Sequence, residues 1–222
     1  GGGFGDGGDP FASFFGGGFG GGFGGAQRRQ RQQQQQPRAA SVDYSGSQVI
    51  MMDHSKWLDA KREKGIWLLQ AYVPRSKQCQ DMAGEWKKAA DSLKGVVKVG
   101  AVDCEAEAGI CGELGAQSYP TIKWLMHGKE GGKYSGRKKG GDIVNWAIGL
   151  LPRHLTTSVV NRPGLASILA RCSGSGKGKA GWSTCVLLFT NKQETAPMFK
   201  SLALQYEGDV TFAEVRGGDV NA

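Results

Sequence analysis

Residues 66–79 read IWLLQAYVPRSKQC, and this stretch decides the fold. Its first eight residues form a nearly continuous apolar run of strand length, which is typical of a strand buried on both faces of a sheet. A helix is expected immediately afterwards, over about 77–93, where apolar residues recur at helical spacing: Met82, Trp86, Ala89, Ala90 and Leu93. A buried strand that leads into an amphipathic helix predicts an α/β domain.

The alternation of strands and helices continues on both sides of this stretch. A short apolar run at 49–52 comes first, and further strands are expected at 96–102, 121–126 and near 133–134. Helices are expected at 55–64, 105–114 and 142–151. The order predicts a mixed sheet sandwiched by helices. After Pro152 the pattern restarts, with helices at 162–171 and 194–206 and strands at 185–190 and 210–215.

The chain therefore divides into three expected parts. Residues 1–40 are a disordered linker, because 1–25 hold fourteen Gly and six Phe and 27–36 are an Arg/Gln tract. Residues 41–152 form the first α/β domain. Residues 153–222 are the incomplete start of a second domain of the same type.

Composition narrows the function classes. The net charge of +8 is dispersed along the chain, so it carries little weight as a nucleic-acid signal. No apolar run approaches the roughly 18 residues of a membrane helix. The chain starts at Gly1 without a leader, so we expect a fragment or a processed product. None of the five cysteines has zinc-ligand spacing, so no metal or other cofactor is expected.

Several separated segments resemble the thioredoxin and protein disulfide-isomerase family. Residues 66–79 are similar to the family's V-E-F-Y-A-P-W-C-G-H-C segment, and 119–121 match its Y-P-T, in which the proline is cis and faces the active site. Residues 102–103, 133–137 and 142–146 match three more family segments in order and spacing. The resemblance covers 49–151 and implies a thioredoxin-like fold for this part, with the second domain as a further repeat.

The departures from the family pattern concern its chemistry. Ser76 stands where the family has its nucleophilic cysteine, and a hydroxyl is not ionised near neutral pH. Gln70 replaces the carboxylate that shuttles protons, and Arg75 replaces the tryptophan before the nucleophile. Cys79 keeps the second cysteine position, either as a buried small hydrophobe or as a thiol that captures clients. We therefore expect no enzyme.

The resemblance also implies a client-binding surface and structural disulfides. The surface is expected at Arg75, Ser76, Tyr119 and Pro120. A continuous helix would hold Cys104 and Cys111 about 10 Å apart, too far for a bridge, unless Cys104 precedes the helix. The isomerase family often has a disulfide of this spacing here, so we expect one.

The other two cysteines flank a loop. Cys172 and Cys185 lie on either side of a Gly/Ser/Lys-rich stretch and can close it at little strain. Two such bridges indicate an oxidising compartment. With the resemblance, this gives the lumen of the endoplasmic reticulum as the expected location.

The Gly/Phe-rich start resembles the G/F region of J-domain proteins, including a D-P-F motif at 9–11. The resemblance implies an upstream J domain, an Hsp70 partner, and thioredoxin-like domains that bind unfolded or partly oxidised clients for hand-over. The alternative is an atypical protein disulfide oxidoreductase or isomerase acting through Cys79. A nucleic-acid scaffold is a third hypothesis, but the chain has no RGG repeat, so no nucleic-acid partner is expected. The oligomeric state stays open.

Overall fold

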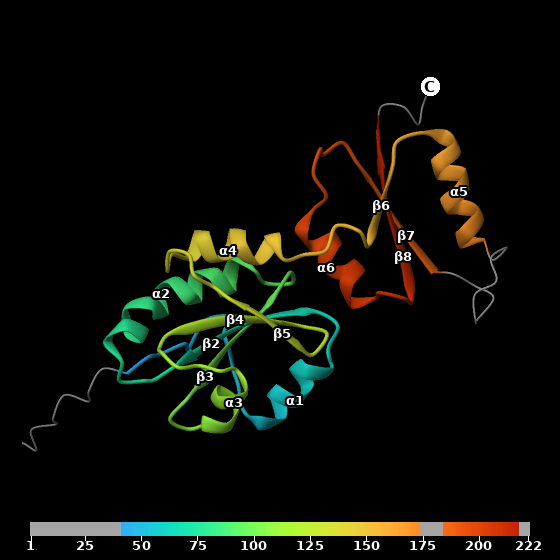
Figure 1. The fold of residues 1–222 in the computed structure, drawn as a ribbon. Coiled ribbons are helices and arrows are strands. Elements are labelled where there is room, and N and C mark those ends of the chain that lie inside the picture. The colour runs from blue at the N-terminus through green and yellow to red at the C-terminus, as the bar shows by residue number, and fades with distance from the viewer. Residues whose placement is uncertain (1–40, 174–183, 218–222) are drawn as a thin grey trace, which may run out of the picture. The chain divides into compact units, whose positions relative to one another are not determined.

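The structure is a computed structural model that describes residues 41–173 and 184–217 (Figure 1). The expected disordered linker at 1–40 and most of the Gly/Ser/Lys-rich loop lie outside the described residues. The described chain contains two sheets, one of five strands and one of three. The expected boundaries at residues 40 and 152 stay a prediction.

The five-stranded sheet is mixed and has the order β1-β3-β2-β4-β5. Its strands are β1 (Ile50–Met51), β2 (Ile66–Tyr72), β3 (Lys98–Asp103), β4 (Thr121–Met126) and β5 (Lys129–Lys133). The first three run parallel, while β4 is antiparallel to β2 and β5 to β4. Every residue of β2 is buried, as the continuous apolar run predicts for a central strand.

Helices cover both faces of this sheet: α1 (His54–Arg62), α2 (Lys77–Ser92), α3 (Ala108–Glu113) and α4 (Gly140–Gly149). One core cluster joins α2 and α4 to the sheet and is anchored by Trp86, which is 0% exposed. The other joins α1 and α3 and is anchored by Trp57, which is 1% exposed. This arrangement confirms the predicted thioredoxin-like sandwich.

The third helix begins later than the sequence predicts. The Asp103 carboxylate accepts a hydrogen bond from the Glu105 amide at 2.9 Å, which makes a turn in place of a first helical turn. As a result α3 starts at Ala108, and Cys104 lies before the helix.

The three-stranded sheet is parallel and has the order β6-β8-β7. Its elements are β6 (Thr156–Val159), α5 (Arg162–Cys172), β7 (Thr184–Thr190), α6 (Pro197–Gln205) and β8 (Val210–Arg216). The sequence does not predict β6, because only its last residue is apolar. The sixth helix begins at Pro197 and not at 194, because the preceding loop bonds to β8 through Thr195.

Candidate functional site

The site predicted from the sequence lies at the carboxyl edge of the five-stranded sheet, meaning the end where the parallel strands β2 and β3 finish. There Tyr72 pairs with Asp103 as the last pair of the two strands. In open α/β sheets this edge is where ligands bind, because the loops and helix N-termini that follow the strands meet there.

Ser76 is the residue immediately before α2. Its amide donates to the Val73 carbonyl at 3.0 Å, and its own carbonyl accepts the Cys79 amide at 3.0 Å. Its hydroxyl makes no capping hydrogen bond to the helix, and its side chain is only half-buried. A small hydroxyl thus occupies the accessible position at the N-terminus of a 16-residue helix.

Cys79 lies in the first turn of α2 and is 0% exposed. All five cysteines lie within the described residues, and Cys79 is the free one. It packs in one cluster with Tyr44 and Tyr72, whose rings meet edge to face with centroids 5.3 Å apart. Burial, with smaller contributions from the Asp103 carboxylate and the Cys79 sulfur, raises the pKa of Tyr72 to about 12.

Gln70 lies two residues before the end of β2 and is fully buried. Its Oε1 accepts a hydrogen bond from the Tyr44 hydroxyl at 2.7 Å, while its Nε2 has no partner among the described residues. A neutral amide therefore stands at the depth where the family resemblance implies a carboxylate, and it cannot exchange a proton with Cys79.

Tyr44 was missed by the sequence analysis. It belongs to a segment at 42–49, here called the strap, that precedes β1 and is held at one end by a 3.1 Å hydrogen bond from the Val42 amide to the Pro74 carbonyl. The side chain of Tyr44 is buried, and burial is the main cause that raises its pKa above the ordinary value. Because the strap is mostly polar, no periodic apolar pattern marks its one anchoring ring.

The Tyr119–Pro120 peptide bond is cis, and Pro120 is buried directly before β4. Since Thr121 pairs with Ala71, near the end of β2, this proline lies at the same carboxyl edge as Ser76. Arg75 is exposed and Tyr119 is half-buried. The topology thus brings the four residues predicted to bind clients to one edge, although no hydrogen bond among them is seen.

The structure pairs Cys104 with Cys111 and Cys172 with Cys185, each with a Cα–Cα distance of 5.7 Å. The first disulfide also lies at the carboxyl edge, because the Cys104 amide donates to the Tyr72 carbonyl at 2.9 Å. Cys104 is half-buried and Cys111 is buried. The two bridges fit an oxidising compartment.

The described residues contain neither a candidate membrane span nor a candidate metal site. No helix in 41–173 or 184–217 is long and apolar enough to cross a membrane. Within the same ranges, no group of three or more His, Cys, Asp or Glu side chains is placed to hold a metal ion.

Comparisons with known proteins agree with this geometry. Residues 48–148 match the thioredoxin family model. Human protein disulfide-isomerase A6 is 37% identical over 119 residues, which are 53% of this chain and 25% of that protein. The Drosophila melanogaster protein disulfide-isomerase A6 homolog is 40% identical over 86 residues, which are 37% of this chain and 20% of that protein. Residues 48–148 therefore form a thioredoxin-like domain, and the relatives that they resemble are protein disulfide-isomerases.

A solved structure, ERdj5 in its form II, superimposes with a TM-score of 0.50 at 24% identity, covering 77% of this chain and 23% of that one. This likeness shows the fold alone. The chain spans 25% of the length of the human relative and 20% of the Drosophila relative, so activities of those whole proteins do not transfer directly.

The expectation that the chain is not an enzyme is wrong. A thioredoxin domain that is related to protein disulfide-isomerases and carries the Cys104–Cys111 disulfide points to a redox-active isomerase. That expectation rested on the loss of the nucleophile at Ser76 together with the loss of the proton shuttle at Gln70. The thiol of Cys79 entered only as the alternative, and the Cys104–Cys111 disulfide entered only as a structural bridge.

Proposed function

We propose that this thioredoxin domain is an atypical protein disulfide oxidoreductase or isomerase that exchanges disulfides with client polypeptides through the single free thiol of Cys79. One observation carries the proposal: Cys79 is the free cysteine, and it lies in the first turn of α2, at the carboxyl edge.

The chemistry needs only one thiol. The Cys79 thiolate attacks a client disulfide, the client S–S bond breaks, a mixed disulfide forms, and the second client sulfur leaves as a thiolate. Another client thiolate then attacks the mixed disulfide and releases Cys79. The client leaves with rearranged disulfides, and no electrons are gained or lost overall, so no external oxidant or reductant is required.

Access to the thiol requires a local rearrangement, because Cys79 is 0% exposed. Tyr44 packs in the same buried cluster as Cys79, and its hydroxyl bonds to Gln70. In this proposal a client that displaces the Tyr44 ring reaches the sulfur. Slow exchange with small disulfides and faster exchange with unfolded chains follow from this arrangement, because a flexible chain can compete for the apolar surface that the ring covers.

The test is refolding of a client whose disulfides have been scrambled, using the full chain and the variants Cys79→Ser and Ser92→Ala. Cys79→Ser is expected to abolish isomerisation, since a hydroxyl at that position is not ionised near neutral pH. Ser92→Ala, at the exposed far end of α2, is the control and keeps the activity. If Cys79→Ser is as active as the unmodified chain, the proposal fails.

A second candidate function is that of a co-chaperone that hands clients to Hsp70 through an upstream J domain. It is favoured by the Gly/Phe-rich segment at 1–25, which lies outside the described residues. In this proposal Arg75, Ser76, Tyr119 and Pro120 contact unfolded or partly oxidised clients in the lumen of the endoplasmic reticulum. Stimulation of Hsp70 ATPase by protein that includes the upstream segment, and its loss without that segment, is the test.

A further inference from the structure

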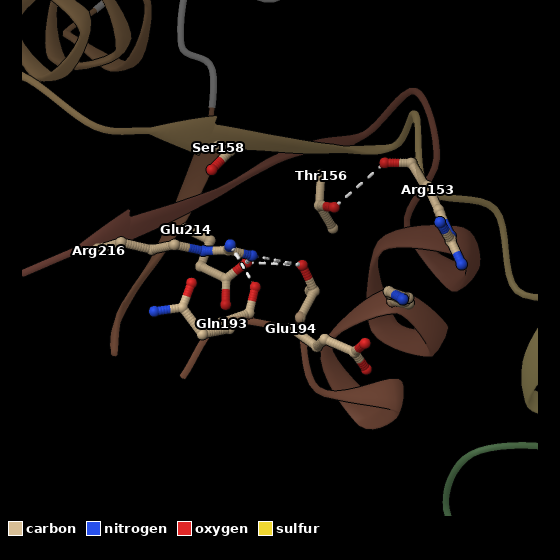
Figure 2. Close-up of a pocket in the computed structure, with 9 residues that line it drawn as sticks. Arg153, Thr156, Ser158, Gln193, Glu194, Glu214 and Arg216 are labelled. Carbon is tan, nitrogen blue, oxygen red and sulfur yellow. Dashed lines mark hydrogen bonds and ion pairs between the residues drawn. The ribbon is translucent and has the colours of Figure 1, made fainter. Parts of the chain in front are cut away.

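The second, three-stranded sheet carries a polar pocket of about 270 Å³ (Figure 2). All of its lining residues belong to residues 153–216, and none belongs to the thioredoxin domain at 48–148. Its floor is formed by Glu214 and Arg216 of β8, and its rim includes Arg153, Glu194 and Lys200.

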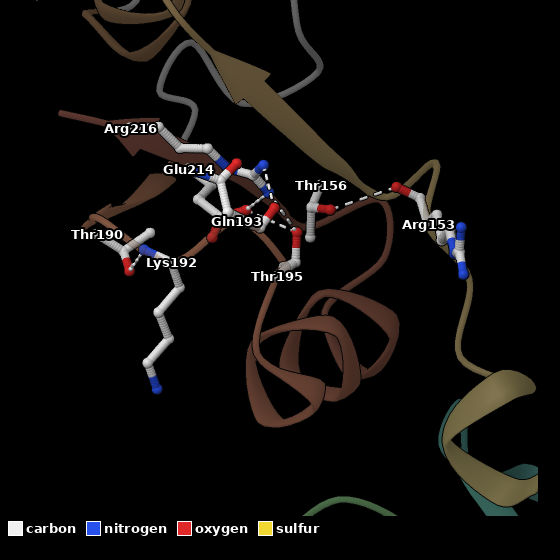
Figure 3. Close-up of polar contacts among 8 residues, drawn as sticks. All are labelled: Arg153, Thr156, Thr190, Lys192, Gln193, Thr195, Glu214 and Arg216. Atoms are coloured by element: carbon white, nitrogen blue, oxygen red, sulfur yellow. Dashed lines mark hydrogen bonds and ion pairs between the residues drawn. The ribbon is translucent and has the colours of Figure 1, made fainter. Parts of the chain in front are cut away.

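The floor contains an ion pair that is incompletely satisfied. Glu214 is 1% exposed, and its Oε2 accepts hydrogen bonds from Thr195 Oγ1 at 2.6 Å and from Arg216 Nη2 at 3.0 Å (Figure 3). Its Oε1 has no partner among the described residues, and neither has Arg216 Nε. A buried carboxylate oxygen without a donor costs free energy, so this floor is built to receive an N–H or O–H group.

The guanidinium of Arg216 is held in place on its other side. Its Nη1 donates to the Gln193 carbonyl, and its Nη2 also reaches Thr195 Oγ1 at 3.3 Å. These contacts join the loop before α6 to β8. The floor is therefore a fixed arrangement and does not depend on a single exposed side chain.

The strand register places the floor of this pocket toward the carboxyl end of its own sheet. Thr190 pairs with Arg216 as the last pair of β7 and β8, just as Tyr72 pairs with Asp103 in the first sheet. The pocket extends from there along one face of the sheet to Thr156, the first residue of β6, and to Arg153 before it. The floor and the loop before α6 thus correspond in position to the Ser76 edge, where α/β folds bind ligands.

The rim adds an excess of positive charge. Glu214 and Arg216 neutralise each other at the floor, which leaves the cations of Arg153 and Lys200 against the carboxylate of Glu194. Figure 2 shows Arg153 across the pocket from Glu214 and Arg216. A ligand that suits both ends carries a hydrogen-bond donor for the floor and an anionic group for the rim.

We propose that this pocket binds an acidic segment of a polypeptide chain. A main-chain N–H donates to Glu214 Oε1, and an Asp or Glu side chain of the ligand faces Arg153 and Lys200. Sulfate carries no donor for Glu214, and inorganic phosphate offers only an O–H group on the anion itself, so it cannot place a donor at the floor and its charge at the rim together. The volume lies just below the range for drug-sized ligands, which suits one or two residues of an extended chain. The site is independent of Cys79.

The test is fluorescence anisotropy of a labelled eight-residue peptide of alternating Glu and Ala with the full chain at low salt. Arg153→Gln and Lys200→Gln are each expected to weaken binding about threefold to fivefold, as for partly exposed charge pairs. Lys192→Gln removes the same charge from the neighbouring loop but does not line the pocket, and Figure 3 shows its side chain pointing away from Glu214. This matched control is expected to keep the affinity.

The floor is tested from the ligand side, so that the fold is not disturbed. The same peptide with N-methylated main-chain amides is expected to bind about tenfold more weakly, because Glu214 Oε1 then receives no donor. The Gln/Ala peptide is also expected to bind weakly, and Cys79→Ser is expected to bind normally.

Four outcomes overturn the proposal: no binding, equal binding of the Gln/Ala peptide, equal weakening by Lys192→Gln, or displacement of the peptide by an equal concentration of phosphate. None of them bears on disulfide exchange, so failure here is distinguishable from failure of the proposed function.

Discussion

The carboxyl edges of the two sheets differ in the buried polar residue that each contains. In the first sheet the buried polar residue is Gln70, a neutral amide covered by Tyr44 of the strap. In the second sheet it is Glu214, a carboxylate that is 1% exposed and is paired with Arg216 at the floor of a pocket. One edge buries a free thiol, and the other buries an ion pair beneath a polar pocket. The difference indicates that the same arrangement of strands and helices suits disulfide exchange in the first sheet and peptide binding in the second, as we propose for each.

The largest expected effect comes from removing the charge at the second edge. Glu214→Leu is expected to lower the free energy of unfolding by about 3 kcal/mol, because Arg216 loses its carboxylate in a mostly buried site. Gln70→Leu, at the buried amide of the first edge, is expected to cost only about 1 kcal/mol, because the amide is neutral and already half satisfied.

Urea unfolding followed by circular dichroism measures both free energies. Glu194→Gln changes an exposed carboxylate of the same loop and is the control, with a change within about 0.5 kcal/mol. Equal costs for Glu214→Leu and Gln70→Leu would remove the contrast between the two edges.

The next largest effect is a change in the rate of disulfide reduction when a cysteine is placed immediately before α2 or α6. Ser76→Cys places a second thiol before α2, three residues from Cys79, and is expected to raise the rate of disulfide reduction at least about tenfold. Ala196 is the residue immediately before α6 and is therefore the matched position in the second sheet. Ala196→Cys, which has no cysteine three residues further on, should give no gain.

Reduction of a fluorescent peptide disulfide measures this rate, with the reductant concentration held constant. A similar gain from both cysteines would show that any thiol at a helix start suffices, and that the two edges do not differ in this respect.

The smallest effect is the pH dependence of the free energy of unfolding that Tyr44 and Tyr72 contribute at the edge of the first sheet. Burial raises the pKa of Tyr44 and Tyr72 above that of an unfolded tyrosine, near 10. Their contribution to stability is full below about pH 10 and is lost as the pH rises toward about 12, because only the unfolded chain ionises in that window. Tyr44→Phe is expected to cost about 1 kcal/mol at pH 8 and to make this decline shallower.

Urea unfolding at pH 8, 10 and 11 tests the decline. Tyr206→Phe, at an exposed tyrosine of the three-stranded part, is the control and should leave the slope unchanged. An identical slope in Tyr44→Phe would mean that Tyr44 does not keep the edge closed.

Much of the fold could be predicted because its signals are local. The fully buried β2 follows from the unbroken apolar run, and α2 ends within one residue of its predicted end because its apolar stripe stops there. The start of α3 could not be placed. It depends on one side-chain hydrogen bond from Asp103, for which composition and periodicity give no signal.

The site was only partly predictable for a related reason. Ser76, Gln70 and Cys79 lie within the motif and were found by it, and the buried strand and a buried Cys79 were among the expectations, but the side chains that they contact were not. Tyr44 meets Gln70 across 26 residues, and Thr195 meets Glu214 across 19. Such pairings arise from tertiary packing, which no single segment encodes.

The hydrogen bond from Val42 to Pro74 ties the start of the strap to the loop that leads into α2. With the bond from Tyr44 to Gln70, it joins the strap to the segment 66–79 at two points. The packing around Cys79 therefore depends on a segment that precedes the sheet in the chain, because Tyr44 belongs to the same buried cluster as the thiol.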